Sequence, residues 1–129
     1  MPGLTNAEAA ATLDARFPTT GGGDFIAYSA NGTTEFAGLA RTAIGATGWA
    51  AATNADPSVK ANGSALTTAA STSAGTVSHW AIMSASSGGT QRTDWTALVG
   101  PDGTTPTPRA LLVGDQLQFA IGKITVTLT

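Results

Sequence analysis

The sequence predicts an all-β fold, an antiparallel β-sandwich (jelly-roll-like) of about eight short strands with a short N-terminal helix. Two observations favour this class. Apolar and polar residues alternate with period two in segment 117–128, "LQFAIGKITVTL", as in strands with one buried face. Turn-forming Gly, Pro, Asn and Asp residues also recur roughly every 8–12 residues, a spacing typical of antiparallel β domains.

The first expected element is a helix over about residues 5–16. Thr5 and Glu8 have the spacing of a capping box, and the alanine-rich run that follows has high helix propensity. Pro18 ends this run. One apolar stripe follows the helix at positions i, i+4 and i+8: Ala9, Leu13 and Phe17.

Three glycines at 21–23 follow the helix and predict a flexible connection. We therefore expect two parts, an N-terminal helix and flexible arm over 1–23 and a β-sandwich domain over 24–129. Because a short helix on such a connection is loosely tethered, we expect the arm to matter less for folding than the sandwich does.

Short strands are expected between the arm and the C-terminal segment. Their ranges are 24–30, 35–44, 49–53, 64–70, 76–84 and 94–99, and residues 109–113 lead into the C-terminal segment. Asn31-Gly32 predicts a hairpin between the first two. Segment 76–84 has apolar residues on both faces, which predicts a central strand that is covered on both sides. Residues 54–62 contain Asp-Pro and end at Asn-Gly, and are expected to form a loop, as are residues 100–108.

The C-terminal segment is predicted to form a hairpin with a type II′ turn at Gly122-Lys123. That turn would place all six apolar residues of the segment on one face, whereas a shift by one residue would scatter them. The expected opposite pairs are Ile121 with Ile124, Phe119 with Val126 and Leu117 with Leu128. We expect Phe119, Val126 and Leu128 to lie in the core.

The composition excludes several classes of function. Charged residues make up 11% of the 129 residues, and the six basic ones are scattered, so we expect no nucleic-acid partner. The chain has no cysteine, which excludes disulfides and thiolate metal sites. It also has no apolar run of about 18 residues, so we expect no membrane partner. The N-terminus lacks the pattern of a secretory signal, which predicts a protein that is made in the cytoplasm and stays soluble unless something carries it elsewhere.

Few residues are candidates for chemistry. His79 is either a general base or metal ligand, or a packed histidine satisfied by a backbone carbonyl; the absence of a second His or Cys favours the latter. The eight carboxylates form no close-spaced pair. Three tryptophans are either core residues or a platform for sugars: Trp49, Trp80 and Trp95. We therefore expect no catalytic, cofactor-binding or metal-binding residues, and no enzyme.

Four segments, in their order along the chain, resemble a family of small virion structural proteins from tailed bacteriophages of actinobacteria. The two longer ones are Val77–Gly89, "VSHWAIMSASSGG", and Val113–Thr129, "VGDQLQFAIGKITVTLT". The other two are 36–44, "FAGLARTAI", and 59–67, "VKANGSALT". The resemblance covers about two thirds of the chain, from Glu35 onward. It does not include the N-terminal helix, and the family's Tyr is absent at 39–41.

The resemblance implies a β-sandwich that binds other virion proteins and has no enzymatic activity. Its members include capsid decoration proteins, tail-fibre-like proteins and minor tail proteins. The expected function is a capsid decoration (cement) protein, a homo-oligomer with a trimer favoured, which binds the major capsid protein on the capsid surface of the virion and stabilises the head. One alternative is a tail or neck appendage. A carbohydrate-binding module, based on the three tryptophans, is an alternative from another class.

Overall fold

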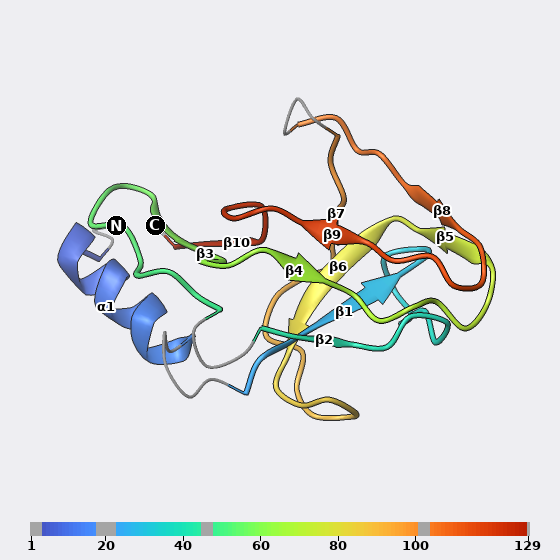
Figure 1. Cartoon of the computed structure of the whole chain (residues 1–129). Helices are drawn as coiled ribbons and strands as arrows, with labels where there is room; N and C mark the ends of the chain where they lie inside the picture. The colour runs from blue at the N-terminus through green and yellow to red at the C-terminus, as the bar shows by residue number, and fades with distance from the viewer. Residues whose placement is uncertain (1–3, 18–22, 45–47, 101–103, 129) are drawn as a thin grey trace. The chain divides into compact units, whose positions relative to one another are not determined.

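The computed structural model describes residues 4–17, 23–44, 48–100 and 104–128 (Figure 1). Most regular structure in these residues is antiparallel β-strand, with one short helix, so the mainly-β prediction is confirmed. The strands are shorter and more numerous than expected. The elements are α1 (Asn6–Arg16), β1 (Phe25–Ser29), β2 (Thr42–Ala43), β3 (Ser58–Ala61), β4 (Leu66–Thr67), β5 (Gly75–Val77), β6 (His79–Met83), β7 (Thr96–Ala97), β8 (Arg109–Leu111), β9 (Gln118–Phe119) and β10 (Thr125–Leu128).

Residue contacts divide the chain into two compact units, whereas the predicted division into 1–23 and 24–129 stays a prediction. The first unit consists of Met1–Gly23, Ile44–Leu66 and Phe119–Thr129, and the second of Asp24–Ala43 and Thr67–Gln118. The N-terminal helix therefore shares a unit with two later segments of the chain.

The second unit is built on a four-stranded sheet with the order β2-β1-β6-β7. β1 and β6 pair along their full length, from Phe25 opposite Met83 to Ser29 opposite His79. Four of the five residues of β6 are buried, so the prediction of a central strand covered on both faces is confirmed. The predicted strand 76–84 is interrupted at Ser78, and the part before the interruption, β5, pairs with β8 instead.

Apolar side chains of β1, β5 and β6 form the core of the second unit. Its fully buried members include Ile26, Val77 and Ile82. Tyr28 is also fully buried, and its hydroxyl lies 2.6 Å from Oγ1 of Thr42 on β2. Burial raises the pKa of the Tyr28 phenol, so this group stays neutral and keeps its hydrogen bond.

The first unit packs α1 against β3 and β10. The predicted helix is confirmed within one residue at its start, and the backbone N–H of Glu8 donates to Oγ1 of the N-cap residue Thr5 at 3.2 Å. The predicted apolar stripe is buried, together with one further alanine. These residues are Ala9, Ala10, Leu13 and Phe17. Because α1 carries a buried face, it is an integral part of this unit.

The predicted C-terminal hairpin is wrong. β10 pairs with β3, with Thr125 opposite Ala61, and β9 pairs with β4. The chain does turn at Gly122, which has φ +82°, but Ile121 is 66% exposed whereas Ile124 is fully buried. Residues Phe119, Val126 and Leu128 are half-buried rather than core.

Asn62 explains why this hairpin does not form. Its backbone N–H donates to the carbonyl of Ile124, and its side-chain Oδ1 accepts from the Ile124 N–H. Its Nδ2 donates to the carbonyl of Ala120, and its own carbonyl accepts from Gly122 N–H. Only one backbone bond closes the turn directly, from Lys123 N–H to the Ala120 carbonyl at 3.2 Å, whereas Ile124, Gly122 and the same Ala120 carbonyl bond to Asn62. Alternation indicates which face of a strand is buried, but not which strand is its partner.

Two other local predictions are also wrong. β3 lies inside the predicted loop 54–62, and its buried residues are the polar Ser58 and Lys60. Segment 49–53 contains no strand, since Trp49 makes only an isolated bridge to Asn62. The first error arises because the turn-forming Asp-Pro and Asn-Gly pairs outweigh a short alternation of polar residues in a purely local analysis.

Candidate functional site

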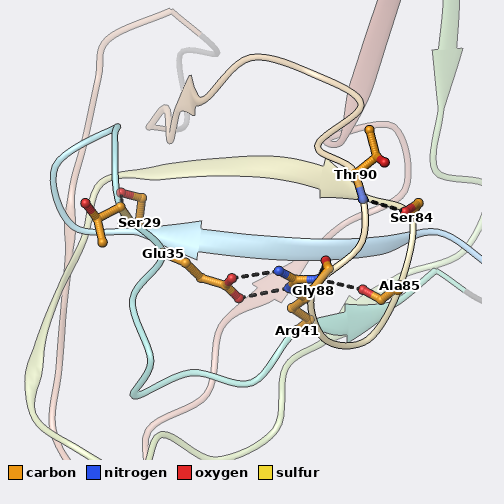
Figure 2. A network of polar contacts seen from close by, with 8 residues as sticks. Ser29, Glu35, Arg41, Ser84, Ala85, Gly88 and Thr90 are labelled. Atoms are coloured by element: carbon orange, nitrogen blue, oxygen red, sulfur yellow. Dashed lines mark hydrogen bonds and ion pairs between the residues drawn. The ribbon is translucent and has the colours of Figure 1, made fainter.

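A network of polar contacts surrounds Arg41 in the second unit (Figure 2). Its Nε and Nη2 donate to the two carboxylate oxygens of Glu35 at 2.9 and 2.8 Å. Its Nη1 donates to the carbonyls of Ala85 and Gly88 at 2.8 and 2.7 Å. The side chain is 8% exposed, and Glu35 raises the pKa of the guanidinium. Arg41 is therefore committed to internal partners and is not available to bind an anion.

The contacts of Arg41 fix the loop that follows β6, residues 84–90. The loop closes on itself, because Ser84 N–H donates to the Thr90 carbonyl and Thr90 N–H donates to Ser84 Oγ (Figure 2). Gly89 has φ +73°, and a Cβ there would lie 2.7 Å from Ser84 Oγ. This loop needs its glycine and exposes small, polar residues to solvent.

The predicted Asn31-Gly32 turn is present, but as a longer loop than a two-residue hairpin. Ser29 and Glu35 face each other across it in an isolated bridge. Oδ1 of Asn31 accepts hydrogen bonds from the N–H groups of Thr33 and Thr34, and Ser29 Oγ accepts one from Gly32 N–H. The loop brings Glu35 to Arg41, so its role in the structure is to position the ion pair.

His79 is half-buried at the start of β6. Its Nδ1 lies 2.7 Å from Oγ of Ser78, which is also 3.3 Å from the carbonyl of Ser29. The partner is thus a hydroxyl, not the backbone carbonyl that the sequence predicted. Where a hydroxyl and an imidazole act as nucleophile and base, a third group usually orients the ring. No carboxylate of the described ranges bonds to this ring.

The tryptophans are mainly core residues. Trp49 and Trp80 are buried, and Trp49 packs against Phe17 with ring centroids 5.4 Å apart. Trp95 is half-buried and packs against a small apolar cluster. This cluster consists of Ala27, Ala81 and Met83. Because two of the three rings are covered, the observation that suggested a sugar platform no longer supports it.

Three carboxylates of the described residues pair with three different cations. Glu35 pairs with Arg41, Asp14 with Lys60 and Asp24 with Arg92. The Asp24–Arg92 contact, at 3.1 Å, is an ion pair without an aligned hydrogen bond to Arg92 Nε. Within the described ranges, no group of three or more His, Cys, Asp or Glu side chains is arranged to hold a metal ion.

The pair of Asp14 and Lys60 joins α1 to β3 in the first unit. Lys60 is completely buried, and its Nζ donates to Oδ1 of Asp14 at 2.6 Å. The same oxygen accepts from the backbone N–H of Ala52 at 2.9 Å. The hydrogen bond from Lys60 holds the pKa of Asp14 below its usual range, although burial opposes this shift. The carboxylate therefore stays charged and compensates the buried ammonium.

Sequence reasoning missed the buried polar row Ser58, Lys60 and Asn62, which are all fully buried. A signal was present, because these residues alternate with period two and thus lie on one side of an extended chain. Lysine is almost never fully buried unless it is paired. The partner of Lys60, Asp14, lies 46 residues away in the sequence, so its burial was not visible locally.

With Arg41, Lys60 and their partners committed internally, exposed apolar side chains are the next features to consider. Large aliphatic side chains that are exposed in the described part of the chain are Leu4, Val99, Leu112, Val113 and Ile121. Of these, Leu112 and Val113 are neighbours in the chain, and exposed aliphatic residues that stand together often mark sites of protein interaction. The candidate site is therefore this exposed pair, as a contact surface.

Neither a scan against protein-family models nor a search of curated proteins finds a match to this chain. No helix among the described residues is long and apolar enough to cross a membrane.

Proposed function

We propose that this protein is a bacteriophage virion structural protein, a capsid decoration protein that binds the outside of the major capsid protein lattice and stabilises the head. The observation that carries the proposal is the resemblance of segments Val77–Gly89 and Val113–Thr129 to virion proteins of tailed actinobacterial phages. In this proposal the protein is a homo-oligomer, with a trimer favoured, and is not an enzyme. Its antiparallel sheets form a jelly-roll-like sandwich, as the family has.

Two features of the molecule support this proposal. The Gly-Gly turn of the first segment lies in the loop 84–90, which Arg41 holds in place. In this protein the motif therefore shapes a loop, as expected for a structural motif. The second segment begins with the exposed Val113 and includes the exposed Ile121. A low charge content also reduces repulsion between neighbouring copies on a lattice, where many weak contacts add.

Quantitative mass spectrometry of purified virions, with the major capsid protein as internal reference, tests the location. Hundreds of copies per particle are expected for a decoration protein. A low multiple of three or six copies would instead identify a tail or neck appendage, and absence from the particle would contradict both functions.

Heads that lack the protein provide the functional test. We expect purified protein to co-sediment with such heads until the sites are saturated, and to raise the temperature at which the heads release DNA. A head stability that does not change after saturation would contradict the cement role, even if the protein binds.

A further inference from the structure

Leu112 and Val113 are adjacent in the chain, and each is 70% exposed. We name this pair the 112–113 knob. The turn that carries it is braced, because Asp115 accepts from Leu112 N–H through Oδ2 at 2.8 Å and donates its own N–H to the Leu112 carbonyl at 3.0 Å. Ser71 adds two backbone bonds, one to Gly114 and one to Asp115, both 2.8 Å long.

This bracing matters for binding. A rigid turn that already presents its apolar side chains loses little conformational entropy when a partner covers them. Two large aliphatic side chains held in water by a hydrogen-bonded turn are thus a preformed anchor for a partner with a small apolar recess. Asp115 adds a negative charge beside the anchor, and its Oδ1 accepts no hydrogen bond from the described residues.

A recess of this kind lies on the exposed side of α1. It is a shallow, mostly apolar hollow, named here the α1 hollow, and the described residues that line it are Ala11, Thr12, Ala15 and Arg16. Two alanines one turn apart leave room for a neighbouring side chain to approach the helix closely. The Arg16 side chain is exposed and has no hydrogen bond or ion pair with any residue that the structure describes.

We propose that the 112–113 knob of one copy docks into the α1 hollow of a second copy of this chain. The convex partner is aliphatic and the concave partner is lined by small side chains, so their shapes are complementary. Their charges are also complementary, because Asp115 stands beside the knob and the unpaired Arg16 borders the hollow.

The knob and the hollow are different surfaces, so the contact is heterologous. A heterologous contact produces a closed ring when the rotation between copies closes, and an open chain otherwise. A ring of three copies would be the trimer of the proposed function, and the inference deepens that function by naming the surfaces between copies. The contact is smaller than a standard stable interface, so we expect concentration-dependent association in solution.

Sedimentation equilibrium of purified full-length protein tests the inference, from about 10 μM to about 1 mM. As the concentration increases, the apparent mass of the wild type is expected to rise from the monomer mass of 12.8 kDa to at least twice that value. A knob variant, Leu112→Asp with Val113→Asp, and a hollow variant, Ala11→Glu with Ala15→Glu, should each stay monomeric. The matched control is Ile121→Asp, an equally exposed aliphatic position elsewhere, which should associate as the wild type does.

An equimolar mixture of the two variants gives the sharpest result. The knob variant keeps its hollow and the hollow variant keeps its knob, so the mixture should form a one-to-one dimer and nothing larger. A monomeric wild type at all concentrations, a knob variant that associates normally, or a mixture that stays monomeric would each overturn the inference. Circular dichroism checks folding, and Leu112→Ser with Val113→Thr replaces the knob variant if that variant is unfolded. Because only purified protein is used, failure here is distinguishable from failure to bind heads.

Discussion

Lys60 shows most clearly how one residue can depend on distant ones. Its ammonium is completely buried, while the Asp14 side chain that compensates it is 43% exposed. An isolated buried charge is costly. The ion pair therefore mainly offsets the cost of burying the Lys60 ammonium and adds little net stability to the fold. The pair also ties α1 to β3, which makes the position of the helix specific.

The first prediction concerns removal of one charge of this pair. Asp14→Asn should lower the free energy of unfolding by about 1–3 kcal/mol, because the buried ammonium loses its counter-charge. Adding Lys60→Met should recover part of this loss, since an unbranched apolar side chain of similar length needs no partner. Urea unfolding curves measure both effects. Asp94→Asn, at an exposed site, is the control, and a double variant less stable than Asp14→Asn would contradict the account.

Acid should weaken the same contact. The folded-state pKa of Asp14 is lowered, so the contribution of Asp14 is complete above its ordinary pKa of about 3.9 and is lost as the pH falls toward the folded-state value. We therefore expect the difference in melting temperature between the wild type and Asp14→Asn to be constant near neutral pH and to shrink below about pH 4. A difference that stays constant down to pH 2 would show that Asp14 titrates normally.

Among the elements, α1 differs most from its expected role. The sequence predicted a loosely tethered helix, but Leu13 and Phe17 are buried and α1 packs on β3 and β10. Leu13→Ala should therefore cost about 2–5 kcal/mol of stability, as buried leucine truncations do. Leu4→Ala, at a 49% exposed position before the helix, is the matched control and should change stability far less. Thermal melting compares the two, and equal effects would indicate a helix that contributes little packing.

The loop 84–90 depends on another element, the segment that carries Arg41. Arg41→Lys keeps the charge but removes the fork that reaches Glu35 and two loop carbonyls at once. We expect the amide hydrogens of Ser84 and Thr90 to exchange about tenfold faster or more, since bonds to charged groups are lost. Hydrogen-exchange mass spectrometry measures this rate. Arg16→Lys should leave it unchanged, and protection equal to that of the wild type in Arg41→Lys would contradict the role of the fork.

At the scale of the whole molecule, the path of the chain links the two units. The chain passes from one unit to the other four times, after residues 23, 43, 66 and 118. Neither unit is a continuous segment, so neither can be cut out as an independent domain. We expect one cooperative unfolding transition, as is usual below about 150 residues. Calorimetry and circular dichroism should give coincident melting curves, whereas two resolved transitions would show that the units unfold separately.

The sequence by itself determined the mainly-β class, the helix from its cap at Thr5, the first strand and the central, doubly covered β6. Of the two alternatives that it offered for the tryptophans, the core one holds for Trp49 and Trp80, which are buried. These features follow from propensity, capping and the pattern of apolar residues, which act over neighbouring positions.

Only the tertiary structure decided the partner of the C-terminal strand, the existence of β3 and the burial of Lys60. β10 pairs with β3 because Asn62 bonds to the backbone on both sides of the Gly122 turn. Lys60 is buried because Asp14, on a helix far away in sequence, compensates its charge. Alternation specifies a face, whereas a partner is chosen by the hydrogen bonds and charges that folding brings together, and these are not encoded in any local pattern.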